Sequence, residues 1–337
     1  MKKVVVLFFW LMVICLAAAI WGIDKIHTYV NSPINIEKET IITVENGMTY
    51  RSFTRKLVKE GLIESSIWSP LAGRIYPQFS KLKAGSYTAM PGTTFIELFQ
   101  LSHSGKVHQF AITFVEGTTF KQWREQLKNT KNLKLELIDA SQEEIADKLN
   151  LPYKNLEGLF LPETYYYSSG ESDLTLLKRA SVALNATLDE AWETRDSNLP
   201  IKSKYELLTL ASIIEKETAV AKERPIISSV FINRLNKKMR LQTDPTVIYG
   251  MGEAYDGNIT RKDLQTLTPY NTYVIYGLPP TPIAMVGKAA IFAAAKPERT
   301  PYYYFVAKGD GGHKFSTTLR EHNKAVRDYL DYLKKNK

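Results

Sequence analysis

The sequence is restricted most by an apolar, uncharged run from Val4 to Ile23, directly after two lysines. In a helix with a rise of about 1.5 Å per residue, these 20 residues span roughly the 30 Å hydrocarbon layer of a bilayer. Lys2 and Lys3 before the run and Asp24 after it place the N-terminus in the cytoplasm by the positive-inside rule. We therefore expect a transmembrane helix at residues 4–23, a cytoplasmic tip at residues 1–3, and the rest of the chain outside the cytoplasm.

A cleaved secretory signal is the alternative for this run, because Ala17-Ala18-Ala19 offers a small-residue cleavage site. The apolar core of such a signal usually has about 7–15 residues, which is shorter than the run found here. No cysteine closes the run in the manner of a lipoprotein signal. The length of the run favours an uncleaved anchor.

The net charge is +9, from 44 Lys and Arg residues against 35 Asp and Glu residues, and it favours anionic partners. The basic residues are scattered among acidic ones and form no stripe with interleaved aromatic residues. A nucleic-acid partner is therefore not expected. Anionic lipid headgroups fit the same charge.

Several classes of enzyme are excluded by the residues that the chain lacks. The one cysteine, Cys15, lies in the apolar run, so the rest of the chain has no disulfide, zinc-thiolate site or cysteine nucleophile. There is no Gly-x-Ser-x-Gly elbow, no phosphate-binding loop and no dinucleotide fingerprint. No zinc-helix spacing and no acidic ligand cluster is found at the five histidines, which are His27, His103, His108, His313 and His322. We expect no metal and no cofactor, which leaves carboxylate chemistry.

A small module is predicted after a short polar linker at residues 24–39. Residues 40–106 contain two cycles of strand, turn and helix, at 41–60 and at 83–101. This alternation resembles the LysM-like module, which binds N-acetylglucosamine polymers. A purely structural α+β module is the alternative.

Residues 107–337 predict a larger mixed α/β domain, so the chain as a whole is expected to be of the α+β class. After Asp244 the sequence is rich in Gly, Pro, Tyr and Thr, which predicts loops of the kind that often carry substrate contacts. The expected elements are strands at 108–115 and 302–307 and helices at 120–128, 174–192, 205–220, 226–235 and 317–335.

The helix at 205–220 is strongly apolar and ends in two acids, Glu215 and Glu217. At about 100° per residue, Glu217 lies on the side of Ile213 and Ile214, whereas Glu215 lies at the other edge of the apolar stripe. This geometry favours Glu217 only slightly as a desolvated acid.

A carboxyl group beside Leu and Ile side chains is partly removed from water, which raises its pKa toward the value useful for a proton donor. Cleavage of a glycosidic bond requires such an acid. From the residues alone, the alternative is a solvated Glu217 paired with a cation such as Lys216 or Arg224.

Resemblance to a known family is carried by three long motifs, Ala211–Ala219, Val230–Leu235 and Leu241–Gly250. They closely resemble the endolytic murein transglycosylases, the MltG or YceG-like family. Shorter motifs match in the same order, at Leu156–Tyr165, Tyr270–Tyr273, Gly277–Pro280 and Gly311–Ser316. The similarity covers nearly the whole chain, including the anchor and the LysM-like part.

The resemblance implies that the second glutamate of the Glu-Lys-Glu-Thr run, Glu217, is catalytic, with Glu215 as the fallback assignment. Thr218 takes the place of the serine in the Glu-Ser pair of other lytic transglycosylases. The implied reaction cleaves the β-1,4 bond between N-acetylmuramic acid and N-acetylglucosamine inside a peptidoglycan strand without consuming water. Glu217 acts first as acid and then as base, and the muramoyl C6 hydroxyl closes onto C1 to give a 1,6-anhydro end.

A muramidase-type hydrolase is the nearest rival hypothesis. Such an enzyme needs a second carboxylate, about 5–5.5 Å or 6.5–9.5 Å from the acid. Asp244 is the candidate for that carboxylate. The alternative for Asp244 is a turn residue before Pro245 that also bonds the substrate.

The predicted loops contain side chains that suit a sugar-binding cleft. Amides and hydroxyls bond sugar substituents, and tyrosine rings stack on sugar faces. With 19 tyrosines in the chain, packing is an equally strong alternative for any one of them. His313 is expected to contact substrate or to order its loop. The expected substrate-binding residues are Thr218, Gln242, Thr243, Asp244, Tyr270, Asn271, Tyr273 and His313.

A non-catalytic alternative is a membrane-tethered, glycan-binding scaffold of the wall-synthesis machinery. The expected partners are peptidoglycan strands, the lipid bilayer and, as the resemblance implies, peptidoglycan synthases. The expected location is the inner (cytoplasmic) membrane, with the catalytic domain in the periplasm or extracytoplasmic space. A scaffold needs no acid on an apolar face, so Glu217 discriminates between the two hypotheses.

Overall fold

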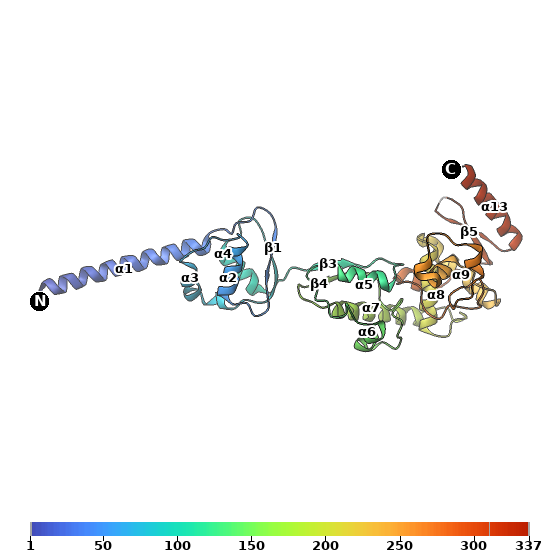
Figure 1. The fold of residues 1–337 in the computed structure, drawn as a ribbon, viewed down its shortest axis with the longest axis horizontal. Helices are drawn as coiled ribbons and strands as arrows, with labels where there is room; N and C mark the ends of the chain where they lie inside the picture. Colours follow the sequence, from blue (N-terminus) through green and yellow to red (C-terminus); the bar gives the residue numbers. More distant parts are fainter. Residues whose placement is uncertain (1, 310, 336–337) are drawn as a thin grey trace. The chain divides into compact units, whose positions relative to one another are not determined.

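The computed structural model describes residues 2–309 and 311–335, which form a mixed arrangement of helices and short strands (Figure 1). The chain divides into two compact units. Unit 1 contains the chain up to Phe110 together with Tyr166–Glu171, and unit 2 contains Ala111–Tyr165 and the chain from Ser172 onward.

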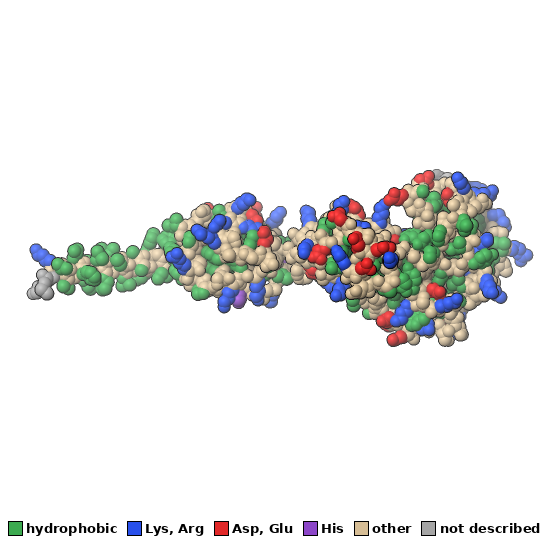
Figure 2. Space-filling view, turned by 60° about the horizontal axis from the view of Figure 1, so that its bottom comes forward, with side chains coloured by type: hydrophobic (Ala, Val, Ile, Leu, Met, Phe, Trp, Pro, Cys, Tyr) green, Lys and Arg blue, Asp and Glu red, His purple; other side chains and the backbone are tan. Residues whose placement is uncertain are grey.

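The first helix, α1 (Lys2–Asn31), is long and apolar enough to cross a membrane, as a secretory signal also would be. Most of its side chains between Val4 and Ile23 are exposed, and they form the apolar rod seen in Figure 2. The helix continues beyond Ile23, so the first half of the expected linker, Asp24–Asn31, is helical. The reason is that Ile26 and Val30 are buried in the core of unit 1.

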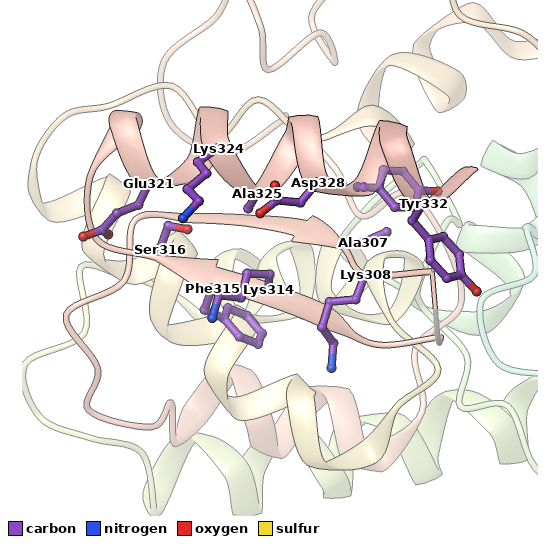
Figure 3. A pocket seen from close by; sticks show the side chains of 11 residues that line it. Ala307, Lys308, Lys314, Phe315, Ser316, Glu321, Lys324, Ala325, Asp328 and Tyr332 are labelled. Carbon is purple, nitrogen blue, oxygen red and sulfur yellow. The ribbon is translucent and has the colours of Figure 1, made fainter. Parts of the chain in front are cut away.

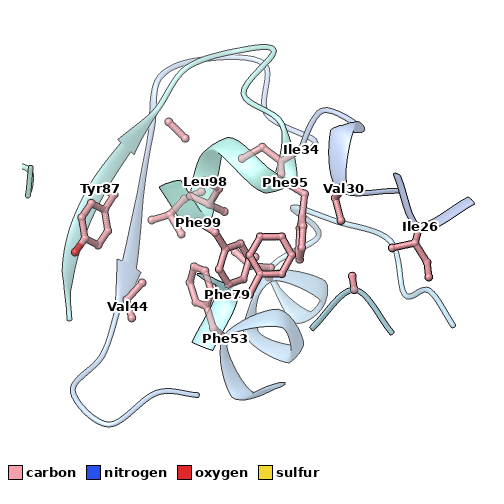
Figure 4. Packing of buried hydrophobic residues seen from close by; sticks show 14 residues of the cluster. Ile26, Val30, Ile34, Val44, Phe53, Phe79, Tyr87, Phe95, Leu98 and Phe99 are labelled. Atoms are coloured by element: carbon pink, nitrogen blue, oxygen red, sulfur yellow. The ribbon is translucent and has the colours of Figure 1, made fainter. Parts of the chain in front are cut away.

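Unit 1 contains the two expected cycles of strand, turn and helix. Strand β1 pairs antiparallel with β2, from Thr40 opposite Ala89 to Val44 opposite Gly85. The core is a cluster of aromatic rings, with the ring of Phe99 in contact with those of Phe53 and Phe79, and it includes the C-terminal end of α1 (Figure 4). The elements after α1 are β1 (Thr40–Val44), α2 (Tyr50–Lys59), α3 (Ser69–Ile75), the 3-10 helix η1 (Pro77–Ser80), β2 (Gly85–Ala89) and α4 (Phe95–Ser104).

Unit 2 is mainly helical. Among the described residues, the one sheet that belongs wholly to this unit is the antiparallel pair of β5 (Tyr304–Ala307) and β6 (His313–Ser316). The division between the units cuts through the sheet β3 (Phe110–Thr113) with β4 (Thr164–Tyr167). The helices are α5 (Phe120–Lys128), α6 (Gln142–Leu149), α7 (Asp173–Glu193), α8 (Lys204–Glu217), η2 (Ala221–Glu223), α9 (Arg224–Asn236), α10 (Asp244–Met251), η3 (Gly252–Ala254), α11 (Arg261–Gln265), α12 (Lys288–Ala295) and α13 (Leu319–Lys335), and the strands are β5 (Tyr304–Ala307) and β6 (His313–Ser316).

Helix α8 is the centre of unit 2, where it packs against α7, α9, α10 and α12. Every residue from Leu207 to Ile214 is buried. A helix that is covered on all sides fixes the position of its last turn, because its apolar residues have one packed arrangement. The acids at its C-terminal end are therefore held in place by the core.

Three helices, α10, α11 and α12, lie where loops were expected, and each has a local reason. α11 begins with a capping box formed by Thr260 and Asp263. α10 begins with Asp244-Pro245, and proline fits the first turn of a helix because its missing N–H has no partner there. α12 contains five alanines in eight residues and is buried, so it has no amphipathic pattern to reveal it. β5 is half-buried rather than buried as expected.

Candidate active site

The acid at the end of α8 is positioned by both ends of that helix. At the start, the Ser203 hydroxyl accepts a hydrogen bond from the backbone N–H of Glu206 (3.1 Å). At the other end, Thr218 has extended backbone angles (φ −148°, ψ 134°), which makes Glu217 the last helical residue. Glu217 is half-buried, at the boundary between the core and the surface.

A second segment brings a hydroxyl to this acid. The Thr243 hydroxyl donates a hydrogen bond to Oε1 of Glu217. Thr243 is held from both sides, because its N–H donates to the Thr272 hydroxyl (3.1 Å) and its carbonyl accepts from the Thr246 hydroxyl (2.7 Å). Both supporting threonines are fully buried, so the position of the Thr243 donor is fixed by the fold.

The electrostatic surroundings of Glu217 raise its pKa to about 7. Burial is the largest cause, because removal from water disfavours the charged carboxylate. The Thr243 hydrogen bond lowers the pKa, the nearby negative charge of Asp244 raises it, and the positive charge of Arg234 lowers it. A carboxyl group with a pKa of about 7 can both give and take a proton near neutral pH.

Arg234 is a site residue to which the sequence analysis assigned no role. Its side chain is buried, with 7% exposed, and it donates to the carbonyls of Tyr303 (2.6 Å), Arg240 (3.1 Å) and Leu241 (2.9 Å). It also donates to Oε1 of Gln242 at 3.3 Å. The guanidinium thus holds the segment that leads into Thr243. Its place in the Val230–Leu235 motif was the available signal, but the carbonyl partners cannot be inferred from sequence spacing.

Gln242 and Asp244 are exposed on either side of the buried Thr243. Gln242 has a φ of 53°, a left-handed conformation that is uncommon for residues with a side chain and that turns the chain at this point. Asp244, considered above either as a second carboxylate or as a turn residue before Pro245 that also bonds the substrate, is the first residue of α10. Both side chains are therefore accessible beside the Glu217–Thr243 pair.

Tyr273 joins the same cluster, because its hydroxyl donates to Oδ1 of Asp244 at 2.6 Å. Burial and the charge of Asp244 raise the pKa of Tyr273, so this phenol remains protonated at neutral pH. The structure thus brings together Glu217, Thr243, Asp244 and Tyr273, with Gln242 at the edge.

Glu215 has a different environment from Glu217. It is paired with Arg224 (Nη2 to Oε1, 3.3 Å) and accepts a hydrogen bond from the N–H of Gly287 (2.9 Å). Its side chain is 5% exposed, and burial is the main cause that raises its pKa. Arg224, considered above as a cation for Glu217, therefore pairs with Glu215, and Lys216 donates to the carbonyl of Gly117 (3.0 Å).

Three more of the expected substrate-binding residues bond to the protein itself. Asn271 is 1% exposed and donates to the carbonyls of Asp263, Leu264 and Thr266 at 2.7–3.3 Å, so it organises its loop. The Tyr270 hydroxyl lies 2.9 Å from that of Thr281. The buried Thr218 hydroxyl accepts from the N–H of Val220 (3.0 Å) at the end of α8.

His313 takes part in a separate contact with Glu223, through its ring Nδ1 (2.7 Å) and its backbone N–H (2.9 Å). It begins β6, which forms a hairpin with β5 below α13. A groove of about 690 Å³ lies between this hairpin and α13, lined by charged and aromatic side chains such as Lys314, Lys324 and Tyr332 (Figure 3). None of the expected site residues lines it.

Glu157 is another buried acid, and the sequence analysis did not single it out. Its carboxylate accepts from the N–H of Phe120 (3.0 Å) and from the Tyr249 hydroxyl (3.3 Å), and burial raises its pKa to about 7. The next residue, Gly158, has a φ of 78°, and a Cβ there would lie 2.5 Å from Cβ of Pro282. The sequence feature that could have pointed to Glu157 is its position as an acid in the apolar motif Leu156–Tyr165. Its partners make it a link between α5 and α10.

Comparisons with known proteins identify the relatives of this chain. A family model described as the YceG-like family matches residues 42–328. An endolytic murein transglycosylase from Bacillus subtilis (strain 168) is 32% identical over 322 residues, which cover 88% of this chain and 87% of that protein. A protein of the same name from Streptococcus pneumoniae is 24% identical over 331 residues, which cover 88% of this chain but 59% of the longer relative.

A solved structure is similar as well. The crystal structure of a YceG-like protein from Listeria monocytogenes aligns with a TM-score of 0.53 and 30% identity, over 86% of this chain and 99% of that one. The family match runs from β1 into α13 and contains the acid-bearing helix α8. The chain therefore belongs to the YceG-like family.

Proposed function

We propose that this chain is an endolytic lytic transglycosylase, a lyase that cleaves the glycan strands of peptidoglycan. The relatives named endolytic murein transglycosylase support an enzyme of this class with peptidoglycan as substrate. The observation that carries the proposal is the half-buried carboxyl group of Glu217, at the edge of a buried helix and hydrogen-bonded to Thr243.

The proposed reaction begins with Glu217 as general acid. It gives its proton to the oxygen that links N-acetylmuramic acid to N-acetylglucosamine, and the bond between that oxygen and muramoyl C1 breaks. The muramoyl C6 hydroxyl then attacks C1 while the Glu217 carboxylate takes the hydroxyl proton. The products are a new N-acetylglucosamine end and a 1,6-anhydro muramoyl end, and Glu217 is protonated again.

The surroundings of Glu217 suit both steps. Burial keeps the acid form populated near neutral pH, and the Thr243 hydroxyl stabilises the carboxylate that forms after proton transfer. Because the attacking hydroxyl belongs to the substrate, no second carboxylate is required. In this proposal, Gln242, Asp244 and Tyr273 contact the sugar, whereas Thr218, Tyr270 and Asn271 order the segments around them.

The chain's membrane role is part of the same proposal. α1 is a single-pass anchor with its N-terminus in the cytoplasm. The catalytic unit acts outside the cytoplasm on nascent strands, near the synthases that make them. Cleavage there limits the length of the strands. In unit 1, the order of strand, two helices and antiparallel strand supports a LysM-like glycan-binding module.

The proposed function is tested by identifying the reaction products. Purified protein should release anhydromuramyl ends from peptidoglycan, detected by mass spectrometry, with no oxygen-18 taken up when the reaction runs in labelled water. Labelled reducing muramic ends would instead identify a muramidase that uses Asp244 as its second carboxylate. Glu217→Gln should abolish cleavage, whereas the matched variant Glu193→Gln, at the exposed end of α7, should cleave normally.

A glycan-binding scaffold is the non-catalytic alternative. It predicts that neither the wild-type chain nor any variant releases new ends, and that Glu217→Gln behaves normally in cells. If no wall synthase co-purifies with the chain, only the proposed partnership with peptidoglycan synthases is contradicted.

A further inference from the structure

The end of α1 and the start of α3 meet at the level where the proposed membrane span ends. Ile26 and Val30 of α1 are buried in the core of unit 1, so the helix enters this unit as part of it. Trp21, two residues before the end of the apolar run, contacts the ring of Trp68 with centroids 5.6 Å apart. Tryptophan prefers the boundary between hydrocarbon and water, so this contact fits the bilayer surface.

The segment around Trp68 presents apolar side chains to solvent. Ile67 is 79% exposed, and Leu71 and Ile75 on α3 are 40% and 49% exposed. α3 is held in place by Tyr50, whose hydroxyl donates to the Ser69 carbonyl at 2.7 Å. Exposed apolar residues grouped beside a membrane anchor favour partial insertion into the interface.

A cationic groove of about 510 Å³ lies next to this segment, between α2, α3 and the end of α1. Arg51 and Arg55 line it from successive turns of α2, and Arg74 lines it from α3. The acidic residue among its lining residues is Glu64, so the groove has an excess of two positive charges. Within the described part of the chain, none of these three arginines is paired with a carboxylate.

The groove lies at about the outer edge of the lipid headgroup layer. Tyr29 of α1 also lines the groove and lies six residues beyond Ile23, which is about 9 Å along the helix axis. Headgroups occupy roughly the first 5–8 Å outside the hydrocarbon layer. Figure 2 shows Lys and Arg side chains on the part of unit 1 next to the apolar rod of α1.

We propose that this groove binds the phosphate headgroup of an anionic phospholipid through Arg51, Arg55 and Arg74, while Ile67, Trp68 and Leu71 rest in the membrane interface. Guanidinium groups bind phosphate through several hydrogen bonds, and hydroxyl groups in the lining add further donors. Unit 1 would then be seated on the bilayer at a fixed height above the anchor. This inference rests on the membrane anchoring proposed above but not on the cleavage chemistry.

The experiment uses the full chain in nanodiscs made of equal parts phosphatidylcholine and phosphatidylglycerol. Native mass spectrometry counts the lipids of each kind that stay bound after release. Each arginine near an anionic surface contributes on the order of fivefold in affinity, so replacing all three should lower the preference for phosphatidylglycerol by on the order of 100-fold. The test variant is Arg51→Gln with Arg55→Gln and Arg74→Gln.

The matched control removes three positive charges elsewhere on unit 1, by Lys38→Gln, Lys83→Gln and Lys106→Gln, all at exposed positions. It should keep the wild-type preference. The proposal is overturned if the arginine variant keeps the preference, if both variants lose it equally, or if inorganic phosphate alone displaces the bound lipid. Because the readout is lipid binding, a chain that prefers phosphatidylglycerol but releases no anhydromuramyl ends would contradict only the proposed cleavage.

Discussion

The Thr243 hydroxyl donates its hydrogen bond to the carboxylate of Glu217, a residue 26 positions earlier in the chain. Glu217 is the last residue of α8, and Thr243 directly precedes α10. The bond therefore joins two helix ends at the point where the acid becomes accessible. It favours the charged form of Glu217 against the burial that disfavours it.

Replacement of Thr243 by valine should raise the pKa of Glu217 further, because the bond that favours the carboxylate is lost. Hydrogen bonds to charged groups contribute about 1.5–3 kcal/mol, which corresponds to a shift of the alkaline limb of the rate profile by about one pH unit or more upward. The maximal rate should fall by about tenfold, because the base that removes the C6 proton is less well held. Cleavage rates measured against pH check both effects. Thr243→Ser keeps the hydroxyl and should retain the wild-type profile, so an identical shift in both variants would rule out this role.

The raised pKa of Glu217 predicts how activity depends on pH. The first step needs the protonated acid, so the rate should fall about tenfold per pH unit above a pH of about 7. A pH–rate profile of glycan cleavage under single-turnover conditions measures this limb. A limb near the ordinary carboxyl pKa of 4.5 would show that Glu217 is solvated during the reaction.

The same shift predicts a cost in stability. The folded chain holds a proton on Glu217 up to a pH of about 7, whereas the unfolded chain releases it near 4.5. Stability is therefore lost as pH rises between these values, by on the order of 3 kcal/mol. Glu217→Gln removes this dependence, so its stability relative to the wild type should grow by that amount from pH 4 to pH 8. Urea unfolding of both proteins at several pH values tests the slope, and parallel curves would contradict it.

The sequence was sufficient for the elements with a clear period and for placing two acids at the end of an apolar helix. The helices at α5, α7 and α9 and the pair of acids at the end of α8 follow from apolar spacing. Helix α12 could not be predicted, because a buried helix of alanines has no polar face. The different environments of Glu215 and Glu217 were equally inaccessible, since they depend on Gly287 and Thr243 from distant segments.

Asp244→Asn separates the lytic mechanism from hydrolysis. If Asp244 only bonds the substrate and Tyr273, cleavage should stay within about tenfold of the wild-type rate and still give anhydro ends. The negative charge of Asp244 raises the pKa of Glu217. Its loss should therefore lower that pKa and move the alkaline limb to lower pH. Tyr273→Phe removes the hydrogen bond to Asp244 but keeps the charge of Asp244, so its limb should stay closer to that of the wild type. Inactivation by Asp244→Asn on the order of 1,000-fold would assign it the second carboxylate role.

Arg234 is expected to affect both stability and the titration of Glu217. Its guanidinium satisfies three backbone carbonyls and the Gln242 amide oxygen, and Arg234→Met would leave these acceptors without a donor. The free energy of unfolding should fall by about 3 kcal/mol or more. Removal of the positive charge should also raise the pKa of Glu217 and move the alkaline limb upward.

Arg234→Lys keeps the charge but cannot reach every acceptor with one ammonium group, so it should lose stability while its pH limb stays near that of the wild type. Arg261→Met, at an exposed position on α11, controls for the loss of an arginine from unit 2. Thermal melts and pH–rate profiles of the three variants distinguish the two effects. If the Met and Lys variants share one pH limb, Arg234 acts on Glu217 only through the position of the Gln242–Thr243 segment, because charge is the property in which those two side chains differ most.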